Sequence, residues 1–128
     1  MPGPARAGLF VYAHDKARLV RFYEAVAGMT RLHETEELSV LESPDIQLLV
    51  HQIPAHIAAQ FTITSPPERR EECALKFFFT VASLAAARQQ AADRGGEVGT
   101  ENWPGPGFVV CQAMDPEGNI FQLRETTG

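Results

Sequence analysis

Six side chains in this sequence belong to the residue types that most often bind metals or act as nucleophiles. They are His14, His33, His51, His56, Cys73 and Cys111. His51 and His56 lie five residues apart around a proline, a spacing that matches no common metal-binding motif, and His14 and His33 are expected to be lone structural or solvated residues. Among the histidines, His51 is the one of interest for ligand binding, because it lies at the end of an expected strand that borders the cavity predicted below. Two cysteines are too few for a disulfide framework, and Cys111 is expected to be a small buried apolar residue rather than a nucleophile.

Three further polar side chains stand on expected strands and could act on a small molecule: Tyr12, Lys76 and Gln122. A lysine ammonium and a tyrosine hydroxyl can serve as acid–base groups, whereas a glutamine amide can only orient a ligand through hydrogen bonds. Gln122 follows the turn formed by residues 115–119, and strand alternation separates it from the apolar pair Phe121 and Leu123. Gln122 is therefore expected to be solvated, unless its face of the sheet lines a cavity and the amide orients a ligand.

The bulk composition limits the partners. With 128 residues, 45% of them hydrophobic and 21% charged, the chain fits one domain, 1–128, with a core of its own. A net charge of −5 without a basic stripe argues against nucleic acid or an anionic membrane as partner. No stretch approaches the roughly 20 apolar residues of a membrane span, and the start of the sequence lacks an apolar signal core, so a cytoplasmic location is expected. A small-molecule or protein partner remains.

The order of strand and helix patterns predicts an α+β fold of two tandem βαβββ units. The first unit is 8–52 and the second is 75–125, joined by a Pro-rich, charged crossover, 53–74, with a short helical turn near His56. Helices are expected at 16–27 and from Ser83 to 93, and strands at 8–14, 30–34, 38–42, 46–52, 75–81, 97–100, 108–114 and 119–124.

The second unit repeats the first. An offset of 68 residues carries Asp15 to Ser83, both expected helix caps, and Gly28 to Gly96, both expected helix stops. A repeated unit that cannot cover its own apolar face combines with its neighbour, so the mixed sheets are expected to curl around a shared concave cavity. The residues expected under the helices are Leu9, Val11, Phe77 and Phe79, and those expected on the concave side are Phe10, Tyr12, Phe78 and Thr80.

This ordered set of features resembles the vicinal oxygen chelate superfamily, which contains glyoxalase I, extradiol dioxygenases, fosfomycin-resistance enzymes and bleomycin-resistance proteins. The resemblance covers nearly the whole chain. It rests on the strand that ends at Asp15, on residues 22–23 and 28–29, on Gly95 and Gly96, and above all on the turn 115–119 before the last strand. One fold hosts unrelated chemistries, so the resemblance implies the fold more than the reaction.

Enzymes of that superfamily hold a divalent metal through His and Glu side chains on the concave faces of the sheets. The resemblance places these positions at Gly8, Lys76 and Gln122, with the fourth near Leu48, or at Gln47 or Leu49 if the register differs. A glycine has no donor, an ammonium repels a cation, and a neutral amide is a weak ligand. No bound metal is therefore expected, with a divalent metal on other ligands as the alternative.

Two functions remain open. The first is a metal-free small-molecule-binding protein, similar to bleomycin-resistance proteins, whose ligand is planar and partly apolar. The second is an enzyme of the glyoxalase or dioxygenase type (a lyase, isomerase or oxygenase), either metal-dependent or using Lys76 and Tyr12. The predicted ligand-binding residues are Phe10, Tyr12, Lys76, Phe78, Thr80, Trp103 and Gln122. Trp103 is expected either to close the cavity as a stacking lid or to anchor a packed loop, and the family resemblance implies a homodimer.

Overall fold

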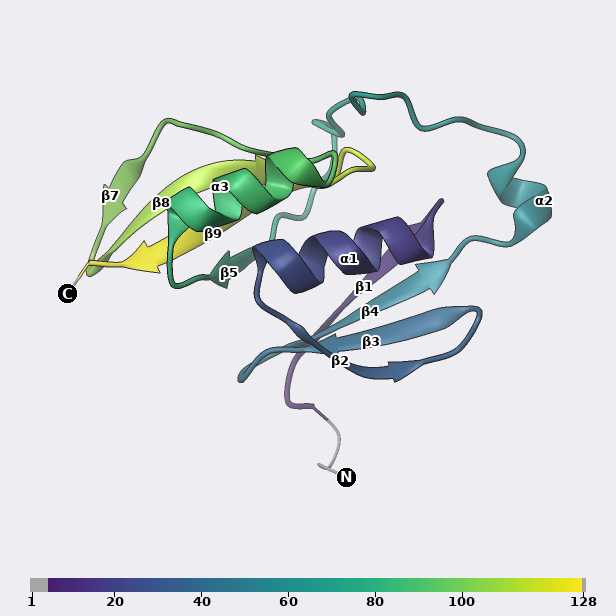
Figure 1. Cartoon of the computed structure of the whole chain (residues 1–128), viewed down its shortest axis with the longest axis horizontal. Coiled ribbons are helices and arrows are strands. Elements are labelled where there is room, and N and C mark those ends of the chain that lie inside the picture. The colour runs from purple at the N-terminus through teal and green to yellow at the C-terminus, as the bar shows by residue number, and fades with distance from the viewer. Residues whose placement is uncertain (1–4, 128) are drawn as a thin grey trace.

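The computed structural model describes residues 5–127, so the outer limits of the predicted domain, 1 and 128, lie outside the described residues. Two mixed β-sheets and two long helices make up the fold, which confirms the predicted α+β class (Figure 1). Sheet A contains, in spatial order, β1 (Gly8–Ala13), β4 (Gln47–Gln52), β3 (Leu38–Glu42) and β2 (Thr30–Glu34). Sheet B contains β5 (Phe78–Thr80), β9 (Ile120–Thr126), β8 (Phe108–Met114) and β6 (Glu97–Val98), with β7 (Trp103–Gly105) also paired to β8. The helices are α1 (Lys16–Val26), α2 (Ala55–Ala58) and α3 (Leu84–Asp93).

The two sheets share one plan, as the repeat in the sequence predicts. In each unit the first strand lies parallel to the last, β1 beside β4 and β5 beside β9. The registers also correspond, because Phe10 lies opposite Leu49 in sheet A and Phe78 lies opposite Gln122 in sheet B. Leu49 and Gln122 therefore occupy equivalent positions in the two units.

Both long helices begin at the predicted caps. The Asp15 carboxylate accepts a hydrogen bond from the backbone N–H of Arg18, and the Ser83 hydroxyl oxygen accepts one from Ala86. Gly28, with φ of 66°, follows the end of α1 in the left-handed region. After α3 the left-handed residue is Gly95, with φ of 81°, rather than the predicted Gly96.

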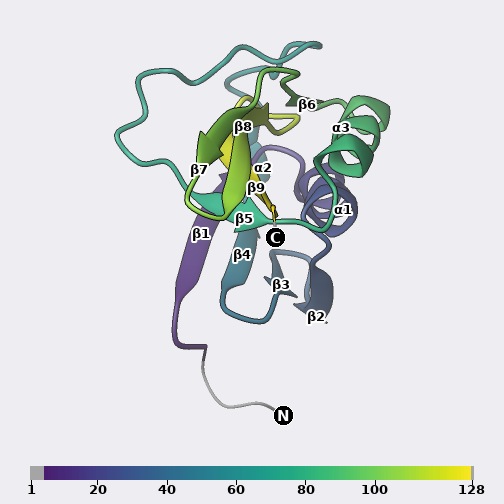
Figure 2. The same cartoon turned by 90° about the vertical axis from the view of Figure 1, so that its left-hand side faces the viewer.

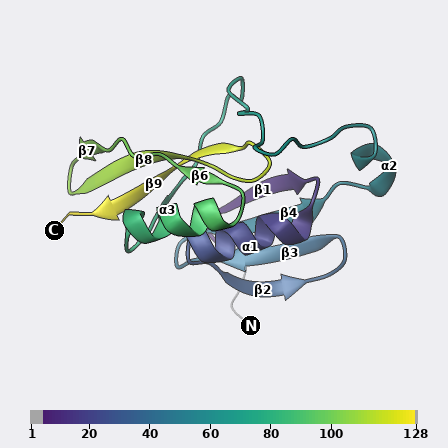
Figure 3. The same cartoon turned by 45° about the horizontal axis from the view of Figure 1, so that its top comes forward.

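The core lies between the helices and one face of each sheet. Figures 2 and 3 show α1 and α3 side by side, with sheet A and sheet B packed around them. Tyr23 and Phe22 of α1 are fully buried, and the Tyr23 ring lies 5.5 Å from the ring of Phe121 in sheet B. Helix α1 of the first unit thus covers apolar surface of the second, which is why neither unit completes its core alone.

Sheet B differs from the prediction at its two edges. The expected strand 75–81 is paired with β9 only over Phe78–Thr80, so Lys76 precedes the strand. The short strand β7 was not predicted, since Pro104 and Gly105 are typical of a loop. Pro104 is tolerated there because β7 pairs with β8 alone and lies at the edge of the sheet.

The crossover from residue 53 to residue 77 leaves the body of the fold as a long arch that carries α2 (Figure 3). His14 holds one end of this arch, because its Nε2 lies 3.0 Å from the carbonyl oxygen of Ala58 and 3.1 Å from that of Phe61. None of the helices within residues 5–127 has the length and apolar character needed to cross a membrane.

Candidate functional site

Each sheet has an outer face, defined here as the face turned away from the helices. Strand alternation and pairing put Phe10, Tyr12, Leu38, Val40, Leu49 and His51 on the outer face of sheet A. The same rule puts Phe78, Thr80, Trp103, Phe108, Gln112, Gln122 and Arg124 on the outer face of sheet B. Six of the seven predicted ligand-binding residues therefore lie on an outer face, and the seventh, Lys76, lies just before β5.

The outer face of sheet A carries three rings in contact. The Phe10 ring centre lies 5.0 Å from that of Tyr12 and 5.8 Å from that of His51, onto which it stacks. Phe10 is 47% exposed and Tyr12 is 65% exposed, so the flat surface of the cluster is open to solvent. His51 is fixed by a hydrogen bond between Nδ1 and the carbonyl oxygen of Gln52, at 2.9 Å. Such a cluster can stack against a planar ligand.

The outer face of sheet B carries a charged group among aromatic rings. The guanidinium carbon of Arg124 lies 3.7 Å from the ring centre of Phe78 and 4.3 Å from that of Phe108. Pairing across β7, β8 and β9 brings Trp103 into the same row as Arg124. The sequence alone gave Arg124 no role, because only the strand order reveals that phenylalanines flank it on both sides.

Lys76 joins this face through Gln112. Its Nζ donates to the side-chain oxygen of Gln112 at 3.4 Å, and Gln112 lies directly opposite Gln122. Lys76, Gln112 and Ile120 line a hollow of about 230 Å³. The strand register that the sequence predicts is correct, because Phe77 stacks in the core on Phe121 at 5.2 Å whereas Phe78 is exposed.

Trp103 is neither a lid nor a buried anchor in this structure. It lies in β7, opposite Val110, and is 40% exposed. The remaining histidines also take ordinary places, since His33 and His56 are exposed. Cys111 is fully buried, and desolvation raises the pKa of its thiol, which fits the predicted apolar role.

The positions that hold the metal in the enzymes of the resembling superfamily do not fit a divalent cation here. The equivalence of Leu49 and Gln122 selects Leu49 as the fourth position, because Leu48 is fully buried in the core. The set is then Gly8, Leu49, Lys76 and Gln122, which offers one neutral amide and one cation. Across residues 5–127, no three His, Cys, Asp or Glu side chains converge as a cation-binding group.

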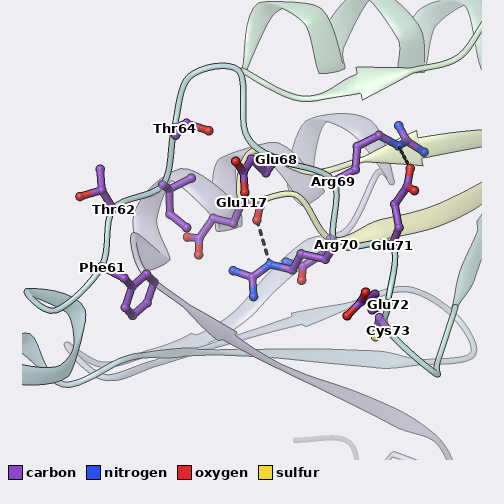
Figure 4. Close-up of a pocket in the computed structure, with 12 residues that line it drawn as sticks. Phe61, Thr62, Thr64, Glu68, Arg69, Arg70, Glu71, Glu72, Cys73 and Glu117 are labelled. Atoms are coloured by element: carbon purple, nitrogen blue, oxygen red, sulfur yellow. Dashed lines mark hydrogen bonds and ion pairs between the residues drawn. The ribbon is translucent and has the colours of Figure 1, made fainter.

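A second hollow lies under the crossover and was not predicted (Figure 4). It has a volume of about 930 Å³ and is lined by the arch, from Phe61 to Cys73, and by the turn between β8 and β9. Arg70 reaches across it and donates from Nε to the carbonyl oxygen of Glu117 at 3.0 Å, as Figure 4 shows. Arg69 pairs with Glu71 on the same wall at 3.2 Å. The lining therefore mixes charges of both signs and contains none of the predicted ligand-binding residues.

A buried polar network joins the two units behind these faces. The Tyr23 hydroxyl donates to Asp115 Oδ2 at 2.7 Å, and the other carboxylate oxygen accepts the backbone N–H groups of Glu117 and Asn119. Burial raises the pKa of Asp115 although these hydrogen bonds oppose the rise. Burial, followed by the charge of Asp115, raises the pKa of Tyr23 well above its usual value.

Glu117 extends this network to the start of α1. Its two carboxylate oxygens accept the backbone N–H groups of His14 at 2.7 Å and Asp15 at 2.8 Å. Three of the conspicuous turn residues therefore act as structural ties: Asp115 and Glu117 accept backbone N–H groups, and the Asn119 side-chain amide donates to Asp115 Oδ2 at 2.8 Å.

Two tandem βαβββ units, the second with β7 as an extra strand, and a parallel outer pair in each sheet define a glyoxalase-like fold. Solved structures share it. A glyoxalase/bleomycin resistance protein/dioxygenase family enzyme from Burkholderia phytofirmans is 16% identical, with a TM-score of 0.70 over 97% of this chain and 100% of that one. A glyoxalase/bleomycin resistance protein from Albidiferax ferrireducens is 16% identical, with a TM-score of 0.66 over 94% and 98%. The fosfomycin resistance protein FosX from Mesorhizobium loti is 14% identical, with a TM-score of 0.63 over 99% and 95%.

A family model described as the glyoxalase-like domain matches residues 8–124, so the chain belongs to the glyoxalase-like domain family. The resemblance to the vicinal oxygen chelate superfamily is thereby confirmed. The sequence comparison with curated proteins found no match. At these identities the solved structures show the fold alone.

Proposed function

We propose that this protein, like the bleomycin-resistance proteins that it resembles, binds a planar, partly apolar small molecule without a bound metal. The proposed binding surface is the outer faces of its sheets. The observation that carries the proposal is the exposure of aromatic side chains where a sheet face is normally polar. The proposed ligand-binding residues are Phe10, Tyr12, Lys76, Phe78, Thr80, Trp103 and Gln122. Exposed aromatic patches on a folded chain usually mark a binding surface.

We further propose that residues 1–128 form one cytoplasmic domain, with units 8–52 and 75–125, that works as a homodimer. Both sheets expose rings, and the predicted cavity needs a second apolar wall. Two chains that bring their outer faces together supply that wall. Sedimentation velocity tests this: we expect a dimer, and Tyr12→Glu should shift it towards monomer, whereas a wild-type monomer contradicts the proposal.

Ligand binding is tested with a matched pair of apolar exposed residues. Phe78 is 47% exposed on the outer face of sheet B, and Ile57 is 42% exposed on α2, which belongs to neither sheet. We expect Phe78→Ala to weaken binding of a flat aromatic carboxylate about tenfold, as measured by calorimetry, since an aromatic stacking contact is worth about 0.5–1.5 kcal/mol beyond its buried area. Ile57→Ala should leave affinity unchanged. Equal effects of the two variants would contradict binding at the outer face.

Elemental analysis separates the binding protein from the metalloenzyme alternative. We expect the dialysed protein to hold no stoichiometric divalent metal, because Gly8, Lys76 and Gln122 replace the expected ligands. One tightly held metal per chain, together with turnover of a glyoxalase or catechol substrate, would favour the enzyme.

A further inference from the structure

Arg124 stands at the centre of the outer face of sheet B, on the strand between β5 and β8. The two neighbouring strands supply the rings that contact it, Phe78 from β5 and Phe108 from β8. The two rings restrict the side chain to one position, and cation–π contact stabilises the charge there. The guanidinium is therefore held in place before any ligand arrives.

This guanidinium has no acceptor. Among residues 5–127, no hydrogen bond or ion pair reaches it, and its Nε is buried without a partner. The other arginines of the fold that are held in place do have acceptors. Arg31 pairs with Glu24 at 2.7 Å, and Arg88 donates to the carbonyl oxygen of Gly99 at 2.7 Å. A buried charged donor without an acceptor is costly, so Arg124 gains by meeting one.

The chemistry of the missing acceptor follows from the geometry of the group. All five guanidinium N–H bonds lie in its plane, while aromatic rings contact its faces. An acceptor must therefore approach along the edge, and a carboxylate does so with two parallel hydrogen bonds. Trp103 lies two strands from Arg124 in the same row of this face and is 40% exposed, so it can contact an aromatic ring attached to the carboxylate. Lys76, the other cation nearby, already donates to Gln112.

We infer that Arg124 is the anion-recognising residue of the outer face of sheet B, and that the ligand is an aromatic molecule with a carboxylate on its rim. The inference rests on the proposed function, since it names the ligand class of the same face. It assigns the charge recognition to Arg124 instead of Lys76.

The test compares two probes of one shape, 2-naphthoate and the neutral 2-naphthamide, by calorimetry with the full chain. Wild-type protein should bind 2-naphthoate about tenfold or more tightly than 2-naphthamide, because a charge-assisted hydrogen bond is lost in the amide complex. Arg124→Met keeps an apolar stem between the rings and should abolish the preference. Lys76→Met tests the competing cation and should keep the ratio of the two affinities. Arg21→Met, exposed on α1 and away from the outer faces, is the matched control and should change neither affinity.

A measurement on the wild-type protein removes any dependence on how the variant folds. In ¹⁵N-resolved spectra, the Arg124 Nε–H signal should shift on addition of 2-naphthoate and stay in place with 2-naphthamide. Assignment of that signal uses Arg124→Lys, which keeps the charge.

Each of the other possible results contradicts either the role of Arg124 or the proposed function as a whole. If both probes bind equally and Arg124→Met changes neither, the face binds aromatic molecules but Arg124 does not recognise the anion. If the preference is lost in Lys76→Met and kept in Arg124→Met, Lys76 is the receptor. If neither probe binds and the Arg124 signal is unmoved, the proposed function fails together with the inference.

Discussion

The two units share a backbone plan but differ in what they place at equivalent positions. On the outer faces, Phe10 corresponds to Phe78, while His51 of the first unit corresponds to Arg124 of the second. The first face thus presents a cluster of three rings, and the second presents a cation between two rings. Equivalent backbone positions therefore carry unlike chemistry, and of these two positions only Arg124, in sheet B, supplies the cation that the proposed anionic ligand would need.

The turns of the two units differ as strongly. The turn of the first unit, at Ser43 and Asp45, lies at the surface, whereas the turn of the second contains the buried residues Asp115 and Glu117. Within residues 5–127, hydrogen bonds from the second turn reach into the other unit, at Tyr23 and at the start of α1, and the first turn makes none. The second turn therefore helps to hold the two units together. The side chains of the outer faces take no part in this contact.

The largest expected effect comes from a substitution in the second turn, where it contacts the other unit. Asp115→Ala removes the acceptor of Tyr23 Oη and of two backbone N–H groups, all in a buried place. We expect the free energy of unfolding in urea to fall by about 3 kcal/mol or more. Asp45→Ala, in the exposed turn of the first unit, should cost about 0.5 kcal/mol or less. Similar losses in both variants would remove the distinction between the turns.

Gly118→Ala should have the next largest effect. Gly118 has φ of 88°, and a Cβ there would collide with the backbone carbonyl of Glu68 in the crossover. We expect a loss of about 2 kcal/mol or more, since the left-handed backbone alone costs about 1–2 kcal/mol. Gly107 is the matched control, because its φ is 80° but a Cβ meets no atom within 4 Å. Thermal unfolding of both alanine variants isolates the contact with the crossover, and equal shifts would mean that this contact is unimportant.

Tyr23→Phe tests the same contact between the units through the pH dependence of folding stability. The folded pKa of Tyr23 lies above its unfolded value of about 10, so folding stability from this hydroxyl is present below about pH 10. It is lost as pH rises from there towards the folded pKa, because the unfolded chain releases the proton first. We expect a loss of about 1–3 kcal/mol at neutral pH and a shallower decline in stability above pH 10 than in wild type.

Chemical denaturation at pH 8, 10 and 11 measures this difference. Tyr12→Phe changes the exposed tyrosine of the first unit and should leave the stability at pH 8 as in wild type. An alkaline decline that is as steep in Tyr23→Phe as in wild type would contradict the assignment.

Apart from β7, the sequence predicted the helices and strands and their faces, because these depend on local patterns. Asp15 and Ser83 cap the helices, and alternation in residues 9–12 and 77–80 separates core from outer face. The roles of Arg124 and Glu117 could not be predicted, since each depends on strands and turns brought together from distant parts of the chain. The hollow under the crossover was missed for the same reason: residues 61–73 show no periodic pattern from which its path could be derived.

The smallest expected effect concerns the caps that the last strand of each unit supplies to its helix. Gln52 accepts the backbone N–H of Lys16, and Glu125, at the corresponding place, accepts that of Leu84 at 2.7 Å. The carboxylate also interacts with the helix dipole, so Glu125→Gln should cost about 0.5 kcal/mol at low salt and less in 1 M NaCl, where screening removes the charge contribution. The reverse change, Gln52→Glu, should not stabilise the first unit, because the Gln52 amide donates to the carbonyl oxygen of His14 at 2.7 Å and a carboxylate would repel it. Urea unfolding at both salt concentrations measures each variant. A gain in stability for Gln52→Glu would show that the dipole outweighs the lost hydrogen bond and that the two caps are interchangeable.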